Sequence, residues 1–237
     1  DAIIVCPAHE SRYDEAIDIL QDKKVPIFAL GNEIHDSRRL CCIRIDAHMS
    51  GSLAAEYMSR MVKDGKYVAV FIGNKDMYDH KEKADGFVFE AEKRGMNVIG
   101  VYESHDDPNV AYYLTEKIIR ERKDIGGIYV ATANSAAVCK YIDENRIKGV
   151  YIVGTDVSPN TCEYMEKEIM HGIIFQDTIT QGKVAVRTVI DHLVYKKAIE
   201  SSFFITPQLL LKSNMKWYQH QYNDIIIESF DSYNHQE

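Results

Sequence analysis

One pattern recurs along the chain: a short apolar run ends in a few polar residues, and a helical pattern follows. Such runs stand at residues 2–5, 25–30, 67–72, 128–130 and 150–153. Runs that are apolar without alternation predict strands buried on both faces, as in a parallel sheet covered by helices. In such sheets, ligands bind just beyond the carboxyl ends of the strands. The pattern therefore predicts an α/β fold and the edge of the sheet at which a binding site lies.

The segments between the apolar runs have the spacing of amphipathic helices. They predict helices over residues 13–23, 50–63, 81–94, 109–123, 135–145, 161–170 and 182–196. Asn160 and Glu163 fit a capping box for the sixth of these helices, and Gly172 stands where that helix would end in a left-handed residue. Alternation of strand and helix to about residue 211 predicts right-handed crossovers between parallel strands.

Charge and hydropathy exclude several classes of partner. The formal net charge is −8, and the chain has no basic run and no interleaved basic and aromatic stretch. Such a chain cannot neutralise a row of phosphates, so we expect this segment not to bind nucleic acid by itself. No apolar run is long enough to span a bilayer, and no basic region followed by an apolar one opens the chain, so we expect no membrane association.

The cysteines predict free thiols. There are five, an odd number, and they show no metal-ligand spacing. Free thiols are typical of a reducing compartment, which predicts a cytoplasmic protein without a metal site. Cys41 and Cys42 are adjacent within the apparent strand 40–45, so their side chains should point to opposite faces and form no bond.

Local signatures of catalysis are absent from the chain. It contains neither of the glycine-rich phosphate-binding motifs, nor a G-x-S-x-G elbow, nor an H-E-x-x-H pair. The sequence therefore predicts no catalytic residue and no cofactor.

Five short motifs in order resemble the effector-binding domain of the lactose-repressor type of bacterial transcription regulators. The motifs are Val25-Pro26-Ile27-Phe28, Lys83-Ala84-Asp85-Gly86-Phe87, Thr132-Ala133-Asn134, Val153-Gly154-Thr155-Asp156 and Phe175-Gln176-Asp177. Ile45-Asp46 and the following helix with Gly51 are similar to the family as well. The resemblance covers about 200 residues, and the order of the motifs is more specific than any one of them.

The resemblance implies a type I periplasmic-binding-protein fold, in which two parallel-sheet αβα lobes are joined by three crossovers. The crossovers are expected near 63–66, 175–178 and 203–206. The N-terminal lobe would comprise 1–64 plus 177–204, and the C-terminal lobe 65–176 plus 205–213. The chain starts at what would be the third strand of the first lobe, so the family's DNA-binding headpiece and first two βα units are not in this sequence. Residues 214–237 form a tail that we expect to dock on its own lobe or on a partner.

The resemblance and the strand ends together predict the ligand-binding residues. They are Asp156, Asn134, Lys83, Asp46, Gln176, Tyr78 and His105. Asp46 is equally suited to cap the helix that follows it, and Asp177 is better suited to a cap than to a ligand. Lys83 replaces an arginine that makes forked hydrogen bonds to sugar hydroxyls in the family. A lysine cannot reproduce that fork, so either the effector carries a carboxylate or phosphate or another group fills the role.

Three classes of function remain open. The resemblance favours a cytoplasmic, homodimeric domain that senses a small sugar-like effector, with a purine as a further option, and controls DNA binding by a headpiece. The alternative is a periplasmic sugar-binding protein for transport or chemotaxis, because the fold does not decide between the two. An α/β enzyme that uses the same strand-end residues is the least favoured.

Overall fold

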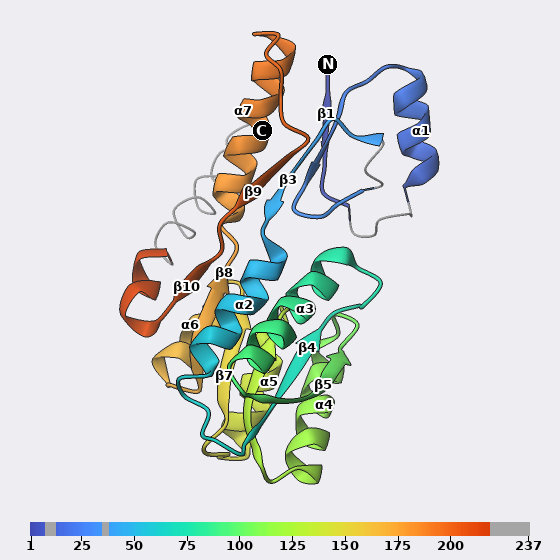
Figure 1. Cartoon of the computed structure of the whole chain (residues 1–237). Coiled ribbons are helices and arrows are strands. Elements are labelled where there is room, and N and C mark those ends of the chain that lie inside the picture. Colours follow the sequence, from blue (N-terminus) through green and yellow to red (C-terminus); the bar gives the residue numbers. More distant parts are fainter. Residues whose placement is uncertain (8–12, 35–37, 219–237) are drawn as a thin grey trace, which may run out of the picture.

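The computed structural model describes residues 1–7, 13–34 and 38–218, which form two αβ lobes (Figure 1). Elements of the first lobe come from both ends of the chain: β1 (Ile3–Val5), α1 (Asp14–Asp22), β2 (Ile27–Leu30), β3 (Cys41–Ile45), α7 (Thr178–Leu193) and β9 (Ser202–Ile205). The second lobe contains α2 (Ala47–Met58), β4 (Tyr67–Ile72), α3 (Tyr78–Lys93), β5 (Asn97–Glu103), α4 (Pro108–Glu121), β6 (Ile125–Val130), α5 (Ser135–Glu144), β7 (Tyr151–Thr155), α6 (Pro159–Glu166), β8 (Met170–Phe175) and β10 (Gln208–Leu210).

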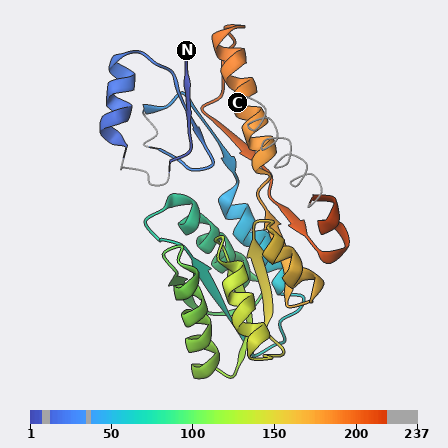
Figure 2. The same ribbon diagram turned by 180° about the vertical axis from the view of Figure 1, so that it is seen from behind.

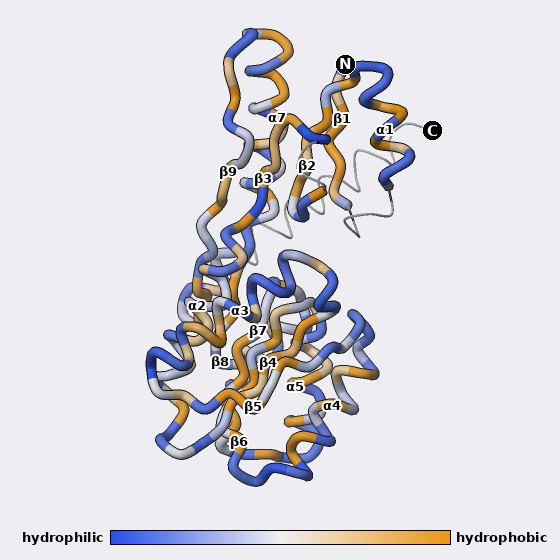
Figure 3. The backbone as a smooth tube through the Cα atoms, turned by 45° about the vertical axis from the view of Figure 1, so that its right-hand side comes forward, coloured by the Kyte–Doolittle hydropathy of each residue, from blue (hydrophilic) through white to orange (hydrophobic). Residues whose placement is uncertain are grey.

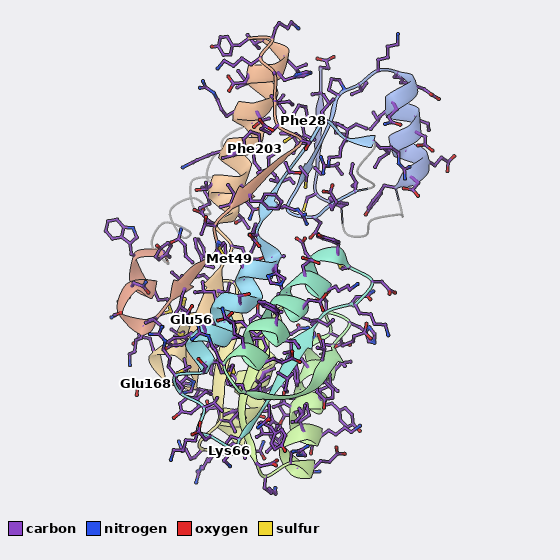
Figure 4. The ribbon with its side chains drawn as sticks, in the orientation of Figure 1. Phe28, Met49, Glu56, Lys66, Glu168 and Phe203 are labelled. Atoms are coloured by element: carbon purple, nitrogen blue, oxygen red, sulfur yellow. The ribbon has the colours of Figure 1, made fainter. Side chains whose placement is uncertain are left out.

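The sheet of the first lobe is parallel, with the strand order β1-β2-β3-β9. Its two faces carry separate apolar clusters. Cys42 packs with Ile17 of α1 on one face, and Cys41 packs with Phe28 and Ala185 of α7 on the other. The prediction that the adjacent cysteines point to opposite faces is therefore confirmed, and both thiols are buried and free. Figure 4 shows Phe28 and Phe203 in this lobe, on the side of α7.

The sheet of the second lobe has the order β10-β8-β7-β6-β4-β5. All of its pairings are parallel except the one between β10 and β8, so this sheet is mixed rather than purely parallel. Helices α2 and α3 cover one face, and α4, α5 and α6 cover the other, which Figure 2 shows from behind. The central strands are apolar, as the colours in Figure 3 show, because both faces are covered.

Two glycines bring α2 and α3 into backbone contact. A Cβ at Gly51 would overlap the carbonyl oxygen of Lys83 and lie 2.6 Å from the backbone nitrogen of Phe87. A Cβ at Gly86 would overlap the carbonyl oxygen of His48. This close approach holds α2 on the second lobe and fixes the start of α3, which carries Lys83.

The packing of α2 corrects the predicted boundary of the first lobe. We expected the first crossover near 63–66, with residues up to 64 in the first lobe. Instead, α2 contacts α3 and the strands β6, β7, β8 and β10 of the second sheet, so the chain crosses at Asp46, directly after β3. The other two crossovers lie where they were expected, between β8 and α7 and between β9 and β10.

A second correction concerns the segment after α6. We expected one helix over 161–170 that ends at Gly172, but the helix ends at Glu166 and Gly172 lies within β8. The capping box is made by Ser158 and Thr161 rather than by Asn160 and Glu163. Residues 169–175 are apolar except for His171, a composition that fits a buried strand between β7 and β10 better than a last helical turn.

The first residues of the tail dock on the second lobe. Met215 is buried, and the ring of Tyr218 packs edge-on against Phe175 with its hydroxyl donating to Gln208 Oε1 at 2.7 Å. Residues 219–237, the rest of the predicted tail, lie outside the described residues.

Candidate functional site

A polar cavity of about 260 Å³ lies between the two lobes, at the carboxyl ends of the strands. The first lobe and its helix α7 contribute Gly31, Asn32, Ile45, Thr178 and Gln181. The second lobe and the crossover contribute Asp79, His80, Lys83, Asp106, Ala131, Thr132, Ala133, Asp156 and Gln176. The predicted edge of the sheet therefore carries a cavity that both lobes line.

Three of the predicted binding residues line this cavity and form one hydrogen-bonded chain. Buried Lys83 donates from Nζ to Gln176 Oε1 at 2.9 Å, and Gln176 Nε2 donates to Asp156 Oδ1 at 2.6 Å. Asp156 has a φ of +69°, a left-handed conformation that costs energy in a residue other than glycine and is concentrated at functional sites. A polyhydroxylated ligand could accept from the ammonium and donate to the carboxylate of this chain.

An ion pair joins the lobes beside the cavity. Arg44 of β3 reaches Asp79 of α3 at 3.1 Å, and its guanidinium lies between the rings of Tyr78 and Phe204, 4.7 and 5.2 Å from their centroids. Desolvation raises the pKa of Asp79, although Lys83 and Arg44 both oppose that shift. Because Arg44 and Asp79 belong to different lobes, this pair holds the lobes in the arrangement seen here.

His80 is held neutral at the wall of the cavity. Its Nδ1 accepts the backbone N–H of Asn74 at 3.0 Å, so this nitrogen carries no proton. Burial lowers the pKa of His80, and the nearby charge of Lys83 lowers it further. A Cβ at Gly73 would overlap the carboxylate of Asp106 and lie 2.5 Å from His80 Cε1, so both side chains pack directly against the backbone of this glycine. The remaining nitrogen of His80 can donate a hydrogen bond to a ligand.

The other four predicted residues surround the cavity without lining it. Asp46 caps α2 by accepting from the backbone N–H of Met49 at 2.8 Å. Asn134 donates to Ser104 Oγ at 3.2 Å and so positions the loop that carries Asp106. Exposed Tyr78 stacks on Arg44, and exposed His105 takes a left-handed conformation beside Asp106. Their roles in ligand binding stay predictions. Asp177 caps α7 as expected.

Sequence reasoning missed several residues of the cavity wall, chiefly Asp79, His80, Asp106, Asn32 and Gln181. A signal existed for Asp79, because Asp79 and Lys83 are four residues apart and share one face of a helix. Gln181 follows the crossover on α7, and its Nε2 donates to the backbone oxygen of Gln176 at 2.6 Å. No motif marks such a residue, because only the return of α7 to the first lobe brings it to the cavity.

Two half-buried histidines predict a loss of stability in mild acid. The pKa values of His80 and His171 are both lowered from 6.5, with burial as the largest cause. The unfolded chain therefore binds more protons below pH 6.5, and the free energy of unfolding falls there by up to about 1.4 kcal/mol per pH unit for each histidine. Urea unfolding between pH 7.5 and 5.5 should show this decrease, and it should shrink in the variant His80→Gln/His171→Gln. An equal decrease in both proteins would contradict the assignment.

Within residues 1–7, 13–34 and 38–218, no group of three or more metal-ligating side chains could hold a metal ion. In the same described ranges, no helix is both long and apolar enough to cross a membrane.

Two αβ lobes with three crossovers and a polar cavity between them define a type I periplasmic-binding-protein-like fold. A family model described as a periplasmic binding protein domain matches residues 1–197, so the chain belongs to that family. The resemblance to lactose-repressor-type regulators is consistent with this fold, but the family match does not single out that branch.

Solved structures agree with this fold. A glucose-galactose binding protein from Geobacillus stearothermophilus is 22% identical with a TM-score of 0.82, over 90% of this chain and 77% of that one. A periplasmic ribose ABC transporter structure from Conexibacter woesei is 21% identical with a TM-score of 0.85, over 93% and 76%. A solute binding protein from Bacillus halodurans with bound myo-inositol is 18% identical with a TM-score of 0.82, over 93% and 78%.

Proposed function

We propose that this domain binds a neutral sugar or polyol in the cavity between its lobes. The observation that carries the proposal is the charge of the cavity wall: Asp79, Asp106 and Asp156 oppose the single ammonium of Lys83, and Asp79 is already paired with Arg44. An anionic ligand would meet a net negative charge, because Asp106 and Asp156 together outweigh the ammonium of Lys83, whereas hydroxyl groups can donate to the carboxylates and accept from Lys83. A carboxylate or phosphate on the ligand, which the replacement of arginine by Lys83 left open, is therefore disfavoured.

The size of the cavity supports a small ligand. Its volume of about 260 Å³ lies just below the range of about 300–1,000 Å³ for drug-sized ligands. Among the described lining residues, His80 has the one aromatic side chain, which favours a sugar over a purine that would stack on larger rings. The similar solved proteins are named for glucose and galactose, for ribose and for bound myo-inositol, which supports the same class.

The comparisons favour solute capture for transport over the regulator that the motif order suggested. The similar structures belong to solute-binding proteins, several of them named for ABC transporters. None of these three is named as an enzyme, so we propose a binding function without catalysis. A regulator with a headpiece, a homodimeric state and a cytoplasmic location remains the second candidate, on the strength of the five ordered motifs.

A thermal-shift screen of monosaccharides, cyclitols, sugar acids, sugar phosphates and purines tests the proposal. We expect a neutral sugar or polyol to raise the melting temperature, and calorimetry to give one site per chain. Stabilisation by a sugar phosphate or a purine, with none by neutral sugars, would overturn the ligand class.

Light scattering and small-angle scattering separate the two candidate systems. Lobes joined by three crossovers can hinge, and a ligand that binds better to the closed arrangement shifts that equilibrium. A monomer whose radius of gyration falls on saturation with ligand would fit a solute-binding protein. A homodimer at micromolar concentration, with the same response, would favour the regulator.

A further inference from the structure

A second and larger cavity lies at the opposite edge of the second sheet. Its volume is about 510 Å³, and it is bounded by the connections that lead into β4, β6 and β7. These are the amino ends of the three strands, whereas the cavity between the lobes lies at their carboxyl ends. Figure 4 shows Lys66, one of the lining residues, at the end of the second lobe that is remote from the first.

Positive charge is concentrated at this cavity. Six of its thirteen lining residues are basic, and none is acidic: Lys63, Lys66, Arg122, Lys123, Arg146 and Lys148. The chain as a whole has a formal net charge of −8, so this concentration runs against its overall charge. The neighbouring acidic side chain of Asp124 is paired with Arg122 at 3.0 Å.

Three of the six basic residues also have a structural role. Lys66 and Lys123 donate to the backbone oxygens of Lys123 and Ile119 at 3.4 and 3.3 Å, which ties the connections together. The guanidinium of Arg122 lies 4.2 Å from the centroid of the Tyr67 ring. These contacts hold three cations at the cavity without neutralising the charge of the lysines.

The other three basic side chains have no such role. Within the described residues, the side chains of Lys63, Arg146 and Lys148 form no ion pair or hydrogen bond, and all three are exposed. They come from two connections that approach each other only in the folded lobe. Like charges gathered in this way repel each other, and a bound anion would relieve that repulsion.

We propose that this basic cavity binds a small organic molecule with two or more phosphate groups. Lysine and arginine are the usual partners of phosphate, and the volume fits a small-molecule ligand. The isoleucines and Tyr151 of the wall offer an apolar surface for the body of such a molecule. The site is separate from the sugar cavity, so this inference does not depend on the proposed function.

Titration calorimetry on the full chain tests the proposal with inorganic pyrophosphate and fructose 1,6-bisphosphate as probes. We expect both to bind and fructose not to compete, and the affinity to fall as the salt concentration rises. The variant Lys63→Ala/Lys148→Ala should weaken binding at least tenfold. Both lysines are exposed and unpaired, so their removal should not unfold the lobe, whereas Arg146 has a φ of +52° and is a poorer position to replace.

The matched control is Lys23→Ala/Lys183→Ala, which removes two exposed lysines of the first lobe, neither of which lines the cavity. It should change the affinity less than twofold. If both double variants weakened binding equally, the effect would be one of net charge and the proposed site would be overturned. Failure of both probes to bind at millimolar concentration would also overturn it. Binding of poly-glutamate without binding of pyrophosphate would assign the surface to an acidic protein instead and would also overturn the proposal.

Discussion

Gly51→Ala is expected to lower the free energy of unfolding by about 3 kcal/mol, at the upper end of the usual cost of overpacking. The added methyl group would meet backbone atoms of Lys83 and Phe87, which cannot rotate away as a side chain can. Helices α2 and α3 would have to separate, and the start of α3 would shift together with Lys83. Urea unfolding measures the stability, and the same variant should also bind ligand more weakly.

Gly182→Ala provides the control. Gly182 also lies in a helix, α7, but a Cβ there meets no atom within 4 Å. This change should be neutral or should stabilise the protein by about 0.5–1 kcal/mol, because alanine favours a helix more than glycine does. Similar effects of the two substitutions would show that α2 and α3 do not depend on backbone contact.

Asp156→Ala is expected to weaken binding of the sugar or polyol identified by the screen by about 5- to 150-fold. The loss corresponds to about 1–3 kcal/mol, the cost of a polar group left without its partner once a ligand covers the site. Here the group is the half-buried Gln176 Nε2, which donates to Asp156 at 2.6 Å, while Gln176 Oε1 accepts from Lys83. Calorimetry measures the affinity, and urea unfolding shows whether the fold is kept.

Two further variants make the result specific. Asp156→Asn retains a side chain that tolerates the left-handed backbone, so it separates the loss of the charge from backbone strain. Asp85→Ala removes a carboxylate from an exposed position on α3 and should leave the affinity unchanged. If Asp156→Ala bound ligand as well as Asp85→Ala does, Asp156 would be removed from the site.

Much of the fold follows from local patterns. The apolar runs predicted strands, because a strand covered on both faces has no polar side to show. The alternation at Cys41 and Cys42 placed the two thiols on opposite faces of β3, and the small polar residues after the strands marked the edge that carries the cavity. Asp156 follows from this strand-end pattern, whereas Lys83 and Gln176 were named from the family resemblance.

Only the tertiary structure determined which distant parts of the chain contact each other. The periodicity predicted a helix over 50–63, where the structure has α2 at Ala47–Met58, but it did not show which sheet the helix covers. That depends on the close contacts of Gly51 and Gly86 between α2 and α3. Arg44 pairs with Asp79 only when the two lobes are folded and in contact. The basic residues of the second cavity likewise come together from separate connections only in the folded lobe. Periodicity depends only on residues that are close together in the sequence. Charge pairing and cavity shape depend on distances between residues that become neighbours only when the chain folds.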